Sequence, residues 1–186
     1  NAFDAEKAKE HWEKGLEELG TEAVTIEILG GDTETAKTMQ EYLQNQLQEN
    51  LPGLTIKLKE VPFAQRLDLD AAMDYDMQLA GWGPDYLDAI SFSNLWITDG
   101  GNNKMGYSNE EYDKLLNDVM TTYANDPVKR FEAMQEAERI LLEEDAAIAP
   151  IYQRGTTRLW KPYVQNVYRH NFGPDFSYKW AYISGK

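Results

Sequence analysis

The apolar and polar positions in the first half of the chain follow two different periodicities. In some stretches apolar residues recur every three or four positions, which predicts helices with one buried face. In others they alternate with polar residues or form short apolar runs bounded by glycine or proline, which predicts strands. Helices are expected over residues 4–19, from Thr33 to the break at Pro52-Gly53, and over residues 63–73; strands are expected over residues 24–29, 54–61 and 76–80. This alternating order implies parallel strands and predicts an α/β fold, a layered mixed sheet with flanking helices.

The second half of the chain begins with a long loop and continues with two helices. Residues 81–106 are rich in glycine and aromatic residues, and long loops of this kind are often functional. Ser108 opens a capping-box pattern that predicts the start of one helix, and Asp126-Pro127 predicts the start of the next. The faces expected to be buried carry Tyr112, Leu115, Leu116, Val119, Met120 and Tyr123 in the first helix and Phe131, Met134, Ala137 and Leu141 in the second. A strand is expected over residues 148–152.

The composition argues against several classes of function. The 186 residues include 18 Lys and Arg against 32 Asp and Glu, which leaves a formal net charge of −14. Such an acidic chain is a poor match for nucleic acid or for an anionic membrane surface. Cysteine is absent, which removes disulfides, thiolate metal sites and cysteine nucleophiles. No apolar run reaches the roughly 20 residues of a membrane span, and we expect the chain, which starts at Asn1, to derive from a longer protein.

Sequence patterns of catalysis and of cofactor binding are missing. His11 and His170 have no partner at a metal-ligand spacing, and the chain contains no nucleophile elbow, Walker A loop or dinucleotide fingerprint. Asp85 and Asp88 lie among aromatic residues and fit the carboxylate pair of a glycoside hydrolase loosely, but chance pairs are expected among so many acids. We therefore expect a chain that is not an enzyme and that uses no cofactor or metal.

The segment over residues 74–88 carries the most specific chemistry. An apolar strand is expected to end at Ala80, and the chain then turns through Gly81-Trp-Gly-Pro84 and presents Asp85. In α/β sheets, ligands bind beyond the carboxyl ends of the strands. A carboxylate beside an indole ring can bind an ammonium group, because the charge pairs with the cation and the ring offers its π face. The alternative is a structural role, with Asp85 capping the loop or the next helix and Trp82 in the core.

The stretch Ala80-Gly-Trp-Gly-Pro-Asp-Tyr-Leu-Asp88 resembles the signature loop of the oligopeptide- and dipeptide-binding proteins of ABC importers. Further segments resemble the same family in order and spacing, namely residues 3–8, 47–58, 61–67, 106–116 and 130–152. The resemblance implies one lobe of a type II periplasmic-binding-protein-like fold. Residues 1–186 would then be a single C-terminal ligand-binding lobe of a larger two-lobed protein, and residues 161–186 a segment that returns toward the other lobe.

The resemblance also implies a binding site. By position, Asp85 would hold the α-amino group of a bound peptide, Trp82 would lie beside the first peptide residue, and the backbone around residues 79–83 would pair with the peptide main chain. Phe63 falls where some family members place a pocket aromatic. The implied ligand-binding residues are Asp85, Trp82, Gly81, Gly83, Tyr86, Phe63 and Leu79. The chain departs from the family at Ala89, where proline is frequent, and shows no obvious arginine near the loop for a peptide carboxylate.

The function implied is the extracytoplasmic solute-binding component of a peptide ABC transporter. Its ligand would be an oligopeptide and its partners the permease subunits, with no nucleic acid and no membrane insertion by this chain. The whole protein would be a cell-surface lipoprotein or a periplasmic protein. Alternatives are a relative that binds a sugar, nickel or heme, a lobe of a peptide-pheromone sensor and, less favoured, a carbohydrate hydrolase.

Overall fold

The structure, a computed structural model, describes residues 3–185, and these residues divide into two compact units. The first unit extends to Gly81 and the second begins at Trp82. Within residues 3–185, no helix combines the length and the apolar character that are needed to cross a bilayer.

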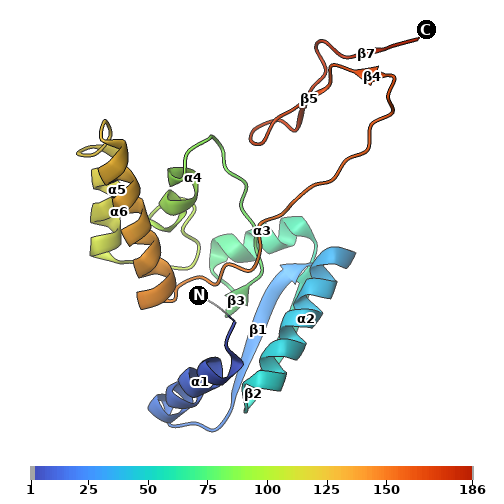
Figure 1. Ribbon diagram of the computed structural model, residues 1–186. Coiled ribbons are helices and arrows are strands. Elements are labelled where there is room, and N and C mark those ends of the chain that lie inside the picture. Colours follow the sequence, from blue (N-terminus) through green and yellow to red (C-terminus); the bar gives the residue numbers. More distant parts are fainter. Residues whose placement is uncertain (1–2, 186) are drawn as a thin grey trace. The chain divides into compact units, whose positions relative to one another are not determined.

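The first unit is an α/β layer (Figure 1). Its elements, in chain order, are α1 (Ala5–Leu19), β1 (Val24–Gly31), α2 (Glu34–Asn50), β2 (Leu54–Val61), α3 (Phe63–Ala72) and β3 (Met77–Gln78). Within residues 3–81, the strands form a three-stranded parallel sheet in the order β2-β1-β3. The α/β class and the parallel pairing predicted from the sequence are therefore confirmed.

The largest buried cluster of the first unit lies on one face of this sheet. Ile28, Leu54 and Ile56 are buried there and pack against apolar residues of α1 and α2. The indole N–H of Trp12 in α1 donates a hydrogen bond of 2.7 Å to the carbonyl oxygen of Pro52, which joins α1 to the turn before β2. Gly53 completes this turn with φ +79°, and its carbonyl oxygen accepts from the N–H of Val24, so the same turn aligns the starts of β1 and β2.

At both edges of the sheet, polar side chains take the place of main-chain hydrogen-bond partners. At the outer edge of β2, the Gln44 side chain donates to the carbonyl oxygen of Ile56 at 2.8 Å, and the Gln48 side chain accepts from its N–H at 2.7 Å. These glutamines of α2 cover the main chain that an added strand would need. Strand β3 is shorter than predicted, because the Asp76 carboxylate, at 2.9 Å, takes the N–H of Glu27 in place of a main-chain partner.

The second unit is mainly helical and ends in an irregular segment with short strands. Its elements are α4 (Ile90–Ser93), η1 (Asn94–Trp96), α5 (Glu110–Met120), α6 (Pro127–Arg139), the π-helical turn η2 (Ile140–Glu144), β4 (Val164–Gln165), β5 (Tyr168–Arg169), β6 (Phe176–Ser177) and β7 (Tyr182–Ile183). Strand β4 pairs antiparallel with β7, and β5 with β6. Its core lies between α5 and α6, where Tyr112, Leu116, Ala137 and Ile140 are almost completely buried.

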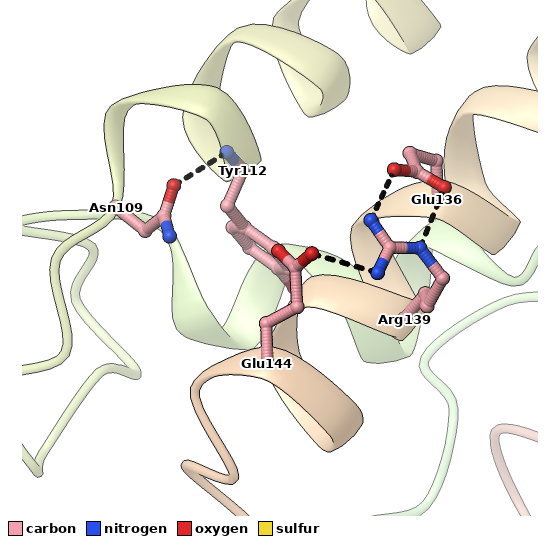
Figure 2. Close-up of polar contacts among 5 residues, drawn as sticks. All are labelled: Asn109, Tyr112, Glu136, Arg139 and Glu144. Atoms are coloured by element: carbon pink, nitrogen blue, oxygen red, sulfur yellow. Dashed lines mark hydrogen bonds and ion pairs between the residues drawn. The ribbon is translucent and has the colours of Figure 1, made fainter.

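The start of α5 differs from the prediction. Asn109, not Ser108, is the N-cap: its side-chain oxygen accepts from the N–H group of Glu111 at 3.0 Å. It also accepts from the N–H group of Tyr112 at 3.1 Å, as Figure 2 shows. The Ser108 hydroxyl instead accepts from the Thr98 hydroxyl at 3.1 Å. The capping-box prediction was therefore wrong by one residue: Asn109 accepts the N–H groups at the start of α5, and Ser108 contacts Thr98.

Three further predictions for this unit were wrong. Residues 148–152 form no strand with any part of residues 3–185, and Ile151 and Tyr152 are exposed. Phe131 is 56% exposed, because the buried face of α6 runs through Ala133 and its helical neighbours and Phe131 lies outside that stripe. Met120, at the end of α5, is half exposed.

Arg139 joins the end of α6 to η2. Its guanidinium donates to both carboxylate oxygens of Glu136, at 2.6 and 3.0 Å, and to Glu144 at 2.8 Å (Figure 2). The hydrogen bonds to Glu136 and Glu144 stabilise the charged guanidinium and raise the pKa of Arg139, and the hydrogen bonds from Arg139 lower the pKa of Glu136. The pairs span the point at which α6 changes from α-helical to π-helical geometry.

Candidate functional site

Two predicted site residues of the second unit are anchored to the same serine. Ser91 is buried in α4. The indole N–H of Trp82 donates to its carbonyl oxygen at 2.9 Å, and the N–H of Asp85 donates to its hydroxyl, also at 2.9 Å. Helix α4 therefore fixes the loop at both residues. The Trp82 side chain is not in the core: the residue is 42% exposed, and Tyr86 next to Asp85 is exposed as well.

The carboxylates of Asp85 and Asp88 have different environments although they are three residues apart. Asp88 forms an ion pair with Arg130 at 2.9 Å and accepts from the N–H of Ile90 at 3.0 Å. The Arg130 hydrogen bond is the main reason why the pKa of Asp88 is lowered. The Asp85 side chain is exposed, and its carboxylate has no hydrogen-bond or ion-pair partner among residues 3–185. Asp88, rather than Asp85, therefore binds Arg130 and the N–H of Ile90, and the Asp85 carboxylate is available to a ligand.

The predicted main-chain site follows strand β3 in the first unit. The N–H of Leu79 donates to the carbonyl oxygen of Leu29 at 2.9 Å, so pairing with β1 continues one residue beyond the strand. The Leu79 side chain packs against the sheet core. The main-chain groups of Ala80 and Gly81 then have no hydrogen-bond partner among residues 3–185. The main-chain groups of Gly83 likewise have no hydrogen-bond partner in the described part of the second unit.

Neither glycine of this segment is required by the fold. A Cβ atom added at Gly81 or at Gly83 would lie more than 4 Å from any other described residue that is not its neighbour, and neither glycine has a positive φ. A side chain at these positions would therefore strain nothing in residues 3–185. Their backbone is open to close approach from outside, which is the property that a main-chain binding site needs.

Phe63 lies at the carboxyl end of the sheet in the first unit. It is the first residue of α3, follows directly on β2 and Pro62, and is 67% exposed. One turn later on α3, the Arg66 guanidinium lies 5.4 Å from the centroid of the Phe63 ring. The sequence analysis missed Arg66. Its spacing of three residues from Phe63 on a predicted helix is the signal that could have identified it.

The described residues contain no group of three or more His, Cys, Asp or Glu side chains placed to hold a metal ion. The first unit does have an open depression of about 510 Å³ beside the sheet, lined by Thr25, Glu27, Lys57 and Asp76 among others. Its acidic side chains are already engaged: Glu27 pairs with Lys59 at 2.9 Å, and Asp76 accepts from the Glu27 N–H. The loop around Asp85 is therefore the better candidate site.

Comparison with known proteins matches this chain to one family of solute-binding proteins. Residues 1–104 match the family described as bacterial extracellular solute-binding proteins, family 5 Middle. The dipeptide-binding protein of Lactococcus lactis subsp. cremoris is 36% identical over 184 residues, which make up 98% of this chain and 33% of that protein.

Solved structures of oligopeptide-binding proteins are also similar to this chain. The substrate-binding domain of an oligopeptide ABC transporter from Bacillus anthracis superposes with a TM-score of 0.91 at 40% identity and covers 98% of this chain and 35% of its own. Listeria monocytogenes OppA bound to peptide gives 0.87 at 47% identity, with 99% and 34% covered. The chain thus spans about a third of the length of the relatives it matches.

Proposed function

Because this chain belongs to the bacterial extracellular solute-binding proteins of family 5, we propose that it is the C-terminal lobe of a peptide-binding protein of an ABC importer. The lobe binds oligopeptides outside the cytoplasm, as part of a cell-surface lipoprotein or a periplasmic protein, and the complete protein delivers them to the permease subunits. Support comes from the Lactococcus relative, which is named a dipeptide-binding protein, and from the Listeria relative, whose structure contains a peptide.

The observation that carries this proposal is the Asp85 carboxylate, exposed and without a partner in residues 3–185, on a backbone held by Ser91. A carboxylate that is already positioned loses little conformational entropy when it binds an ammonium group. The exposed Trp82 ring, anchored to the same serine, adds a π face for the cation. In the proposed site, Asp85 binds the peptide's α-amino group, with Trp82 and Tyr86 beside the first residue.

The main chain of the peptide binds along residues 79–83 in the proposed site. The unpaired backbone groups of Ala80, Gly81 and Gly83 directly follow β3 in the chain, so an extended peptide can add to them as a strand does. Main-chain hydrogen bonds do not depend on peptide side chains, which suits a protein that binds many sequences. Phe63, exposed at the carboxyl end of the sheet, supplies apolar surface for peptide side chains, and Leu79 contributes its main chain.

We also propose that residues 1–186 act as one lobe and that residues 161–186 return toward the rest of the protein. Large apolar side chains are exposed along this segment, at Tyr163, Tyr168, Phe172, Tyr178, Trp180 and Tyr182. Exposed apolar surface of this extent marks a contact with another part of a protein. In the complete protein, this lobe and the other lobe close around the peptide by a hinge motion.

The proposal can be tested by calorimetry on the complete two-lobed protein, with peptides that have a free or an acetylated amino terminus. Asp85→Asn should weaken the binding of free-amine peptides by about tenfold or more, since a charge-assisted hydrogen bond is lost. Acetylation should cause the same loss in the unaltered protein and little further loss in Asp85→Asn. Asp175→Asn, which removes another exposed carboxylate of the second unit, is the control and should bind normally. Unchanged affinity in Asp85→Asn would refute the assignment of the amino group, and no peptide binding at any length would refute the function.

A further inference from the structure

Arg66 lies on α3 and contacts the end of β3, at the carboxyl end of the sheet in the first unit. It is on the first turns of α3, which follows β2, and its guanidinium donates to the side-chain oxygen of Gln78, the last residue of β3, at 2.7 Å. The same guanidinium faces the exposed Phe63 ring. Arg66 is only partly buried, so a group arriving from solvent can reach it.

The charge of Arg66 has no partner in the part of the chain that the structure describes. Two lysines of the first unit, by contrast, are paired: Lys37 lies 3.0 Å from Glu60, and Lys59 lies 2.9 Å from Glu27. For Arg66, no carboxylate within residues 3–185 lies at ion-pair distance, and its side-chain hydrogen bond goes to a neutral amide. A guanidinium has five N–H donors arranged as a fork, so most of its capacity is unused.

Gln78 lies between Arg66 and a neighbouring carboxylate, that of Asp70. Its side-chain oxygen accepts from Arg66, while its side-chain nitrogen donates to Asp70 at 2.6 Å. The amide thus lies between the two charged groups and holds each at its own end. This arrangement orients the guanidinium and leaves its positive charge available to a ligand. A direct ion pair between Arg66 and Asp70 would have neutralised that charge.

On the basis of the function proposed above, we propose that Arg66 binds a carboxylate of the peptide ligand, with Phe63 packing against the adjoining apolar atoms. The chain carries a net charge of −14, which repels any ligand with an anionic group. A peptide with a carboxylate therefore needs a local cation, and Arg66 is the single arginine in the sequence of residues 1–81. The planar fork of a guanidinium matches both oxygens of a carboxylate. Arg66 is then a specificity-determining residue that favours peptides with an anionic group at this position.

The carboxylate can come from the peptide's C-terminus or from an acidic side chain, and two sets of peptides separate these sources. The first set is pentaalanine with a free or an amidated C-terminus. The second is amidated pentaalanine in which each position in turn carries Glu or Gln. Calorimetry on the complete protein gives, for each pair, the ratio of affinities for the charged and the neutral peptide.

The unaltered protein should favour one charged peptide over its neutral counterpart by about tenfold or more. Arg66→Gln should abolish that preference and leave the affinity for the neutral peptide within about twofold, and Arg66→Lys, which keeps the charge without the fork, should retain part of it. Lys57→Gln, which makes the same charge change at an exposed position of β2, should leave the preference unchanged. If Arg66→Gln abolishes the preference between the free and the amidated peptide, Arg66 binds the C-terminal carboxylate. If it abolishes the preference between a Glu peptide and its Gln counterpart, Arg66 binds an acidic side chain.

The inference is overturned if the unaltered protein has no such preference, if Arg66→Gln weakens charged and neutral peptides equally, or if Lys57→Gln has the same effect as Arg66→Gln. Asp85→Asn, measured with the neutral peptides, tests the proposed function separately. If Asp85→Asn weakens these peptides and Arg66→Gln does not discriminate between charge states, only the role of Arg66 fails. If no peptide binds the unaltered protein, the proposed function fails.

Discussion

Replacing Asp88 by asparagine should destabilise the second unit, whereas the same change at Asp85 should not. Asp88 pairs with Arg130 on α6 and accepts from the N–H of Ile90 at the start of α4, so it joins the loop to two helices. Asparagine keeps an oxygen for the Ile90 N–H but loses the negative charge opposite Arg130. The exposed Asp85 carboxylate has no such partner within residues 3–185, so its neutralisation removes no contact from the described fold.

The expected cost follows from the burial of the pair. The side chains of Asp88 and Arg130 retain 29% and 23% of their exposure, so the pair is screened less than a surface salt bridge but is not fully desolvated. Exposed pairs contribute about 0.2–1 kcal/mol and hydrogen bonds to charged groups about 1.5–3 kcal/mol. We therefore expect Asp88→Asn to lower the free energy of unfolding by about 1.5 kcal/mol, and Asp85→Asn to change it by less than about 0.5 kcal/mol.

The contribution of Asp88 also depends on pH. Because Arg130 lowers its pKa in the folded protein, the unfolded chain, with a carboxyl pKa of about 3.9, takes up a proton first as the pH falls. The stabilisation is complete above the unfolded pKa and is lost as the pH falls through the folded value. The difference between Asp88→Asn and the unaltered chain should therefore be largest at neutral pH and should shrink below about pH 4.

Urea unfolding of the chain, followed by tryptophan fluorescence and by circular dichroism, measures these differences. Asp85→Asn is the matched control, since it makes the same chemical change three residues away. Equal loss of stability in both variants, or a cost for Asp88→Asn that does not change between neutral and acidic pH, would refute the argument that pairing with Arg130 distinguishes these two residues.

Two further predictions concern helix and strand starts. Asn109→Ala should destabilise the chain by about 1 kcal/mol in urea unfolding, because two N–H groups of α5 lose their cap, while Ser108→Ala should cost clearly less; the reverse order would restore Ser108 as the cap. Gly53→Ala should lower the free energy of unfolding by about 1–3 kcal/mol, because φ is +79° and the new Cβ would lie 2.2 Å from the carbonyl oxygen of Glu22. Gly81→Ala, where nothing lies within 4 Å of the new Cβ, is the control. Equal stability of the two variants would contradict the turn geometry.

Local sequence patterns predicted most of the first unit. The periodicity of residues 54–61 matched β2, and the helices predicted from residue 4 and from Thr33 match α1 and α2. In the second unit, Asp126 caps α6, at the helix start that was predicted. These signals are local: a cap and the residue it satisfies are three positions apart, and a strand's alternation is visible in a few residues. A prediction failed at Ser108, whose hydroxyl accepts from Thr98 ten residues away while the neighbouring Asn109 caps α5.

The candidate site was only partly accessible to sequence reasoning. The stretch from Gly81 to Asp85 was identified, because its glycines, indole and carboxylate stand together in the chain. Arg66 was missed, because its importance depends on Gln78, twelve residues away, and on the absence of a carboxylate partner within residues 3–185. Whether a charge is neutralised depends on the groups that surround it in space, and these come from several elements.

By itself, the sequence determined the alternation of helices and strands, the α/β class and the loop that carries Asp85 and Asp88, since each of these follows from short-range periodicity or composition. Only the tertiary structure decided which of the two carboxylates is free. Arg130, on α6 and 42 residues along the chain, pairs with Asp88 and leaves Asp85 without a partner among residues 3–185. Coulombic and hydrogen-bond energies depend on distances of a few ångströms, and folding sets those distances between residues that are far apart in the chain.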